Sequence, residues 1–337
     1  MRRPGRAARR GLLLLLSSAC AIEDPVAERR SADAAGLDTS EPDAAALDAS
    51  EPDAGPRGPP FGPPSGVALC LCGEGAFSAP LVVEGGALGI DGALGASDRV
   101  DAVGLIVGGA ATTRAEVRLG ASSTVGADLL GDGPIAVDGD LAVGGDLRAA
   151  ALTVEGRLTQ GPAGTRTVAG ALQALEELRV PVDPPAPCGC SASRAELVAS
   201  RAALERAAIP IAPRARLSDG VFRVEGWQGV DRIQVGGEVD LLVDGDVVSD
   251  GLDVEISGGE LRWWVRGDFS VGRYVGAPLV LLSEAEGTLR LPSGVDVVHL
   301  VAPQAELLVE DPLELRGQLL LRRVSAAASL RLTLHPR

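Results

Sequence analysis

The chain has 337 residues and a formal net charge of −15, because 46 acidic side chains outnumber 31 basic ones. This acidity argues against a nucleic-acid partner, since phosphates attract basic surfaces. Aromatic residues make up only 2% of the chain, although 46% of it is hydrophobic. That balance favours a narrow interior filled by Val, Leu, Ile and Ala.

The first twenty residues predict an export signal. Met1–Arg10 is rich in Arg, Gly11–Ala19 is a short apolar run, and Cys20 follows. The run is too short for a membrane-spanning helix. Two fates of Cys20 stay open. Acylation would leave an even set of four cysteines and attach the protein to the outer membrane or cell surface. Cleavage after Ala21 would remove Cys20 and give a periplasmic or secreted protein.

Residues 21–66 predict a disordered linker. They are acidic and rich in proline, and they contain the near-repeats Leu37–Ala44 and Leu47–Ala54. Such a segment buries too little apolar surface to offset its ordering entropy, and its like charges extend it further. We therefore expect a tether that holds a folded head away from the membrane.

Residues 67–186 predict a first β-solenoid, most clearly at Ile135–Thr159. In each unit an aliphatic residue is followed two places later by another small apolar residue, and Gly or Asp then turns the chain. Residues i and i+2 of a strand share one face, so each unit must stack on its neighbours to bury that face. The predicted fold class is all-β, a parallel β-solenoid, with a β-sandwich as the alternative.

Two segments of this region are ambiguous. Gly85–Asp91 superficially follows the calcium-binding nonapeptide G-G-x-G-x-D, but its spacing differs by one residue, so no metal site is predicted there. Ala171–Arg179 suits a short helix and a continued strand equally well.

Residues 187–210 predict a cysteine hinge followed by a helix. Cys188 and Cys190 form a C-x-C pair, as do Cys70 and Cys72. The two members of each pair would point the same way on a strand. In an exported protein we expect two disulfides between the pairs, with their connectivity open. A Cys₄ zinc site is the alternative, although C-x-C is not the usual C-x₂-C knuckle.

A helix over Arg194–Ala208 is predicted by the capping box Ser193–Glu196 and by Pro210 after its end. Leu197 belongs to its apolar face, and Arg201 to a charged stripe beside that face. We expect this helix to cover an open end or a flank of the solenoid, with dimerisation as the alternative.

Residues 211–337 predict a second β-solenoid. Val239–Asp246 matches Leu261–Asp268 at an offset of 22, and Leu300–Gln304 matches Leu320–Val324 at an offset of 20. The first match places opposite charges side by side on neighbouring strands, which favours that register. The expected neighbours are Asp240 with Arg262 and Asp244 with Arg266.

Residues with catalytic potential are few. His299 lies in the apolar stretch Val297–Val301 and His335 is almost terminal, and we find no nucleophile triad, metal-spaced His cluster or phosphate loop. The corner aspartates, including Asp268 of the tripeptide Arg266–Asp268, are explained by turns. The sequence therefore predicts no catalytic residue, no metal and no cofactor.

One candidate ligand face remains. With Trp263 pointing inward, Trp264 should point outward beside Arg266, where it could stack a sugar or contact a partner, and Tyr274 lies in the same region. Lateral packing of Trp264 against Phe222–Trp227 is the alternative.

The units at Ile135–Leu158 resemble those of bactofilin-type polymer-forming solenoids. The whole layout more closely resembles that of uncharacterised exported lipoproteins of GC-rich Gram-negative bacteria. Its shared parts are the signal, the acidic linker, a Gly-rich solenoid, the hinge Pro184–Cys190 and a second solenoid with the late Ala302–Pro303. This resemblance implies a solenoid architecture, and its motifs carry no known active site to transfer.

We therefore expect a surface-tethered structural or adhesive scaffold without catalytic activity. Its expected partners are the membrane, through a lipid on Cys20, and a glycan or envelope protein. The alternatives are a carbohydrate-binding or carbohydrate-active β-helix that uses Trp264, and a self-associating, filament-forming protein.

Overall fold

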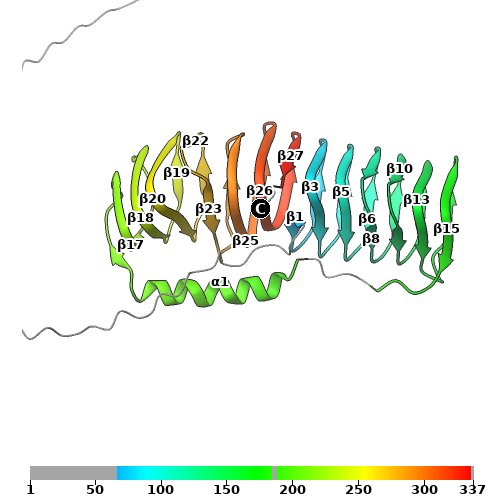
Figure 1. The fold of residues 1–337 in the computed structure, drawn as a ribbon, viewed down its shortest axis with the longest axis horizontal. Helices are drawn as coiled ribbons and strands as arrows, with labels where there is room; N and C mark the ends of the chain where they lie inside the picture. The colour runs from blue at the N-terminus through cyan, green and yellow to red at the C-terminus, as the bar shows by residue number, and fades with distance from the viewer. Residues whose placement is uncertain (1–66, 184–187, 335–337) are drawn as a thin grey trace, which may run out of the picture. The chain divides into compact units, whose positions relative to one another are not determined.

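The computed structural model describes residues 67–183 and 188–334 as a parallel β-solenoid with one α-helix along its side (Figure 1). The predicted signal, the linker, Cys20 and His335 lie outside these residues. Within the described part, no helix is long and apolar enough to cross a membrane. Every pairing between strands is parallel, so the predicted solenoid is confirmed and the β-sandwich alternative is wrong.

Each coil is a triangle of three short strands. We call its faces the helix face, the second face and the third face. In the first described coil these are β1 (Val67–Leu71), β2 (Gly75–Phe77) and the first residues of β3 (Leu81–Ile90). The last residues of β3 open the next coil on the helix face, where Leu88 lies beside Leu69. The alternating buried positions hold the aliphatic residues of one continuous core.

The remaining strands of the first half, residues 67–183, continue this winding. They are β4 (Leu94–Ala96), β5 (Val100–Val107), β6 (Ala111–Thr113), β7 (Val117–Leu119), β8 (Ser123–Val125), β9 (Leu129–Gly131), β10 (Pro134–Val137), β11 (Leu141–Val143), β12 (Leu147–Ala149), β13 (Ala151–Gln160), β14 (Arg166–Val168) and β15 (Leu172–Arg179). Successive coils are about 18 residues long, as the neighbours Val107 and Val125 show. The ambiguous segment Ala171–Arg179 is thus a strand, β15.

The second half, residues 209–334, is wound in the same way. Its strands are β16 (Ile209–Pro210), β17 (Arg216–Val224), β18 (Arg232–Val243), β19 (Val247–Ser249), β20 (Leu252–Val265), β21 (Phe269–Val271), β22 (Tyr274–Val275), β23 (Leu279–Leu282), β24 (Thr288–Arg290), β25 (Val295–Val309), β26 (Leu313–Ala326) and β27 (Leu330–Thr333).

The two halves form one stack, which the sequence did not indicate. β26 pairs with β1 and β2, and β27 pairs with β3, so the last coil of the chain lies directly against the first described coil. The first half winds from this junction to β15 at one end, and the second half starts at β16 at the other end and winds back (Figure 1). The chain is therefore a continuous solenoid whose described start lies inside the stack.

The helix α1 (Cys190–Glu205) lies along the helix face of the second half (Figure 1). Sixteen residues span about 24 Å, which matches about five coil spacings of ~4.8 Å. Its buried Leu197 packs on outward-facing residues of successive coils: Leu242, Trp264, Val280, Leu282, Val301 and Leu320. The helix covers a flank, as one of the two predicted placements states, and its apolar face is occupied by its own solenoid.

The predicted start of α1 is wrong by four residues. The helix begins at Cys190 after Gly189, which has a left-handed φ of 57° and makes no side-chain cap, and Ser193 lies inside the helix. Cys188 and Cys190 are both held by disulfides, so the chain is fixed at the helix start without a capping box. The helix ends at Glu205, three residues before the predicted Ala208.

The register of the second half is confirmed at one match and corrected at the other. Asp240 pairs with Arg262, 22 residues later, and Arg266 Nη1 lies 3.6 Å from Asp244 Oδ1 just beyond that ladder. Leu300, however, pairs with Leu319 and not with Leu320, because a bulge follows Val297 in β25. The offset of 20 therefore holds only before the bulge.

Corner aspartates connect successive coils, which explains why Asp recurs at the turns. Asp128 Oδ1 accepts the backbone N–H of Asp146 at 2.8 Å, and Asp146 Oδ1 in turn accepts that of Thr165 at 2.7 Å. Asp246 and Asp268 form the same ladder, which ends on the N–H of Thr288. Asp268 of the tripeptide Arg266–Asp268 is thus a corner residue, as predicted.

Candidate functional site: a double disulfide clamp at the junction

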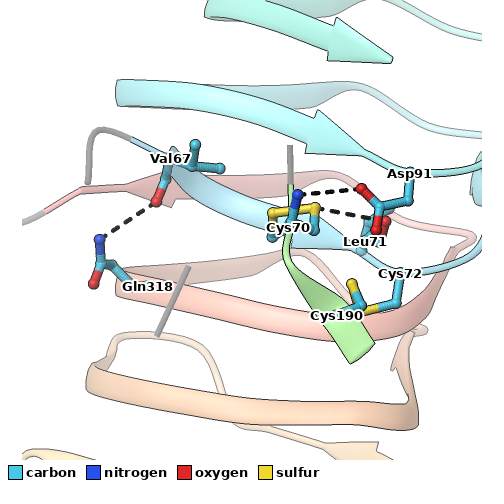
Figure 2. The surroundings of a disulfide bond; sticks show 8 residues. Val67, Cys70, Leu71, Cys72, Asp91, Cys190 and Gln318 are labelled. Atoms are coloured by element: carbon cyan, nitrogen blue, oxygen red, sulfur yellow. Dashed lines mark hydrogen bonds between the residues drawn. A yellow bond between two sulfur atoms is a disulfide. The ribbon is translucent and has the colours of Figure 1, made fainter. Parts of the chain in front are cut away.

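The four cysteines of the described part meet where the two halves join. Cys70 lies in β1 and Cys72 directly follows it, so both point outward on the helix face of the junction coil. Cys188 and Cys190 lie at the start of α1. Figure 2 shows this region, in which β1 runs beside β26 and the first turn of α1 lies across them.

The pairing, which the sequence left open, is Cys70 with Cys188 and Cys72 with Cys190. The Cα atoms are 5.5 Å and 5.6 Å apart, within the usual range for disulfides. The zinc alternative is contradicted, because zinc binds thiolates and these sulfur atoms are bonded to each other. Asp91 has a carboxylate oxygen within 4.8 Å of the Cys188 and Cys190 sulfurs. Both of these sulfurs are in disulfides, so this group offers no thiolate to a metal either.

The two disulfides differ in their surroundings. Cys70 and Cys188 are 0% and 1% exposed, whereas Cys72 and Cys190 are only partly buried. We call Cys70–Cys188 the inner disulfide and Cys72–Cys190 the outer disulfide. Asp91, at the corner after β3, accepts the Cys188 N–H at 3.1 Å (Figure 2). Burial raises the pKa of Asp91, and the bond from Cys188 opposes that rise. Sequence inspection missed Asp91 because its role depends on a segment about a hundred residues away.

The two disulfides, together called the clamp, stabilise the fold by restricting the unfolded chain. Their two contributions to the free energy of unfolding do not simply add. Each joins residues 118 positions apart, and closing so long a loop is worth about 5 kcal/mol in the chain-entropy model. Once one disulfide exists, the other closes a loop of about six residues and adds only about 2 kcal/mol. Either disulfide alone therefore retains most of the entropic effect.

The other end of α1 is held by a buried arginine. Arg201 is 2% exposed, and it donates to the Trp264 carbonyl at 2.6 Å and to Asp244 Oδ1 at 2.9 Å. Burial lowers the pKa of its guanidinium, with nearby Arg266 acting in the same direction. The sequence placed Arg201 in a charged stripe beside the apolar face of the helix. Its burial was missed because the surface that covers it belongs to coils about 40 to 60 residues later. Clamp and arginine together fix both ends of α1 on the solenoid.

The predicted ligand face is absent. Trp264 does point outward from its coil, but α1 covers it, so that it is 4% exposed, and its Nε1 donates to Asp240 Oδ1 at 3.0 Å. Tyr274 is 6% exposed. Arg266 is engaged with Glu205 and Glu284, each at 2.9 Å. The prediction of an exposed Trp264 is therefore wrong, and the indole packs under α1 and not against Phe222–Trp227.

The other aromatic residues of the described part are also buried. They are Phe77, Phe222, Trp227, Trp263, Phe269 and Tyr274, and Trp263 packs edge-on against Trp227 at 5.5 Å. Among the described residues no aromatic ring is thus available to stack on a sugar. His299 is a buried strand residue, as predicted.

Comparisons with known proteins give little beyond this geometry. No family model matches the chain, and no curated protein matches it. Among solved structures it is similar to an ice binding protein from an Antarctic bacterium, Flavobacteriaceae, at 12% identity over 81% of this chain and 97% of that one. The TM-score is 0.23, and this likeness carries no argument about function.

Proposed function

We propose that this chain is an exported, non-catalytic structural or adhesive scaffold. The observation that supports it best is the pairing of β1 with both β26 and β3, which makes a single continuous stack from the two halves. The two disulfides support export, because such bonds persist in oxidising compartments outside the cytosol. The burial of the described aromatic residues argues against the sugar-stacking alternative.

The point of attachment follows from the junction. The described chain starts at Val67, beside β26 and between the two ends of the stack. If Cys20 is acylated, residues 21–66 would connect the membrane to the middle of the solenoid and not to one end. Both ends, at β15 and β16, would then be free, and the long faces would be presented sideways to partners.

Acylation is tested with the full-length chain in a Gram-negative host fed a clickable fatty acid. We expect the wild type to carry the label, to enter the membrane fraction and to be cleaved by protease added to intact cells. Cys20→Ala should lose the label and the membrane association, whereas the matched control Ser18→Ala should keep both. Retention in the cytoplasm with all cysteines reduced would contradict the proposal.

The alternative of a filament is disfavoured by the two ends. At one end of the stack, Arg166 in β14 and Glu177 in β15 form an ion pair at 2.5 Å. They lie beside Leu147 and Leu158, which are core residues of the preceding coil. Stacking another coil on them would bury charge, a common way of protecting sheet edges. At the opposite end β16 contains Pro210, which has no N–H to donate. We therefore propose a scaffold of fixed length.

One surface favours a second candidate function, which is adsorption to a flat ordered surface such as ice. Six neighbouring coils present uncharged outward residues in register on the second face. They are Leu308, Ser325, Ala76, Gly95, Thr112 and Leu130. All of these residues except Leu130 line a shallow groove, which Arg114 and Glu310 also line. Shaping of ice crystals by the protein, abolished by Thr112→Arg but not by Thr153→Arg on the third face, would establish this function. Ordinary crystal growth would exclude ice.

A further inference from the structure

We propose that the outer disulfide, Cys72–Cys190, is a thiol-exchange site that external thiols open while the inner disulfide stays closed. The class of reactant is a small dithiol or an oxidoreductase that carries a reactive pair of cysteines. The inner disulfide is the structural bond of the pair. This inference does not depend on what the scaffold binds.

Accessibility separates the two bonds. A thiolate must approach a disulfide sulfur directly to exchange with it. The cysteines of the inner disulfide are 0% and 1% exposed, whereas Cys72, directly after β1, and Cys190, at the start of α1, are only partly buried. The outer disulfide is therefore the more accessible of the two to an external thiol.

The helix start favours one direction of attack. Cys190 is the first residue of α1, and no side chain caps the free N–H groups of the first turn. These groups and the helix dipole stabilise a thiolate at Cys190. The incoming thiolate therefore bonds to Cys72 Sγ, the Cys72–Cys190 bond breaks, and its electron pair goes to Cys190.

The exchange is balanced by the second thiol of the reactant. It attacks the mixed disulfide on Cys72, so that the dithiol leaves as an oxidised cyclic disulfide and Cys72 and Cys190 gain its two electrons. The fold survives this step because the inner disulfide still joins the same two distant segments. Arg201 continues to hold the far end of α1.

Asp91 is positioned to moderate this exchange. Its carboxylate lies within 4.8 Å of the Cys190 sulfur, and a negative charge there opposes the thiolate that must form. Asp91→Asn removes the charge but keeps an oxygen that can accept the Cys188 N–H. We expect this variant to exchange several-fold faster than the wild type.

The test is native reduction of the purified full-length protein with dithiothreitol, followed by rapid alkylation and peptide mass spectrometry. We expect Cys72 and Cys190 to be alkylated at least about tenfold faster than Cys70 and Cys188, with an unchanged far-UV circular dichroism spectrum. Asp91→Asn should widen this ratio. The matched variant Cys72→Ser/Cys190→Ser should show no fast-reacting thiol.

Three results would overturn the proposal. The first is alkylation of all four cysteines at one rate, and the second is faster alkylation of Cys70 and Cys188. The third is resistance of all four until denaturant unfolds the chain. Each of them would mean that the outer disulfide is as structural as the inner one.

Discussion

Leu69 and Leu319 lie side by side on the helix face, although they belong to the first and last parts of the described chain. Both are completely buried. Their contact closes the stack between β1 and β26, so neither half has its own free end at the junction. The stability of each half should therefore depend on the other.

This dependence predicts energetic coupling across the junction. Leu69→Ala and Leu319→Ala should each cost about 2–5 kcal/mol through the cavities that they create. Because the residues touch, the double variant should differ from the sum by about 0.5–3 kcal/mol. Urea unfolding measures these values. The pair Leu69→Ala/Leu158→Ala, whose members lie several coils apart, is the additive control; equal additivity for both pairs would contradict a joined stack.

Removing both disulfides should cost more than the sum of removing each one alone. Loss of the outer pair through Cys72→Ser/Cys190→Ser should cost about 2 kcal/mol, because the inner disulfide still closes the long loop. Loss of the inner pair alone should cost the same entropic amount plus the packing of two buried side chains. Loss of all four should cost about 7 kcal/mol in chain entropy, plus the same packing. Unfolding free energies that simply add would show that the two bonds act independently.

Arg201 should matter more than any exposed charge on α1. Arg201→Met leaves the Trp264 carbonyl and part of Asp244 without their buried donor, which we expect to cost about 3 kcal/mol. Arg194, exposed on the same helix, provides the control, since Arg194→Met should change stability by less than about 0.5 kcal/mol. Denaturant titration followed by circular dichroism measures both. Equal effects of the two substitutions would mean that the contacts of Arg201 with Trp264 and Asp244 do not stabilise the fold.

The corner ladder should make stability depend on acid pH. Bonds from Thr165 lower the pKa of Asp146 below its ordinary value in the folded protein. The folded state therefore favours the ionised carboxylate above the unfolded pKa, and this stabilisation is lost as the pH falls through the folded pKa. Asp146→Asn keeps an acceptor but cannot ionise, so its unfolding free energy should fall less steeply on acidification. Identical slopes for wild type and variant would refute this.

The sequence was sufficient for local features and insufficient for long-range ones. Alternating aliphatic residues and Gly or Asp corners are set within a coil, so the solenoid and the pair Asp240–Arg262 could be predicted. The bulge after Val297 changes a register by one residue without a clear local signal. The pairing of β1 with β26 at the junction could not be predicted from local sequence, because the inward residues of both strands are ordinary aliphatics that would stack on any coil.

The candidate site was predictable in kind but not in connectivity. Two C-x-C pairs in an exported chain suggest disulfides, yet which cysteine meets which depends on how the chain returns to the junction. The prediction that Trp264 is exposed was wrong for the same reason, since α1, from a distant part of the sequence, covers it.

The most direct test of the joined stack is a cross-link across the junction on the second face. Ala76 in β2 is the register neighbour of Ser325 in β26, and both side chains point outward. Ala76→Cys/Ser325→Cys should therefore form a disulfide readily in the folded full-length protein under mild oxidation. Ala76→Cys/Thr167→Cys, which spans five coil spacings or about 24 Å, should not. A stack built from both halves predicts this contrast, whereas two separate solenoids would leave Ala76→Cys/Ser325→Cys unlinked.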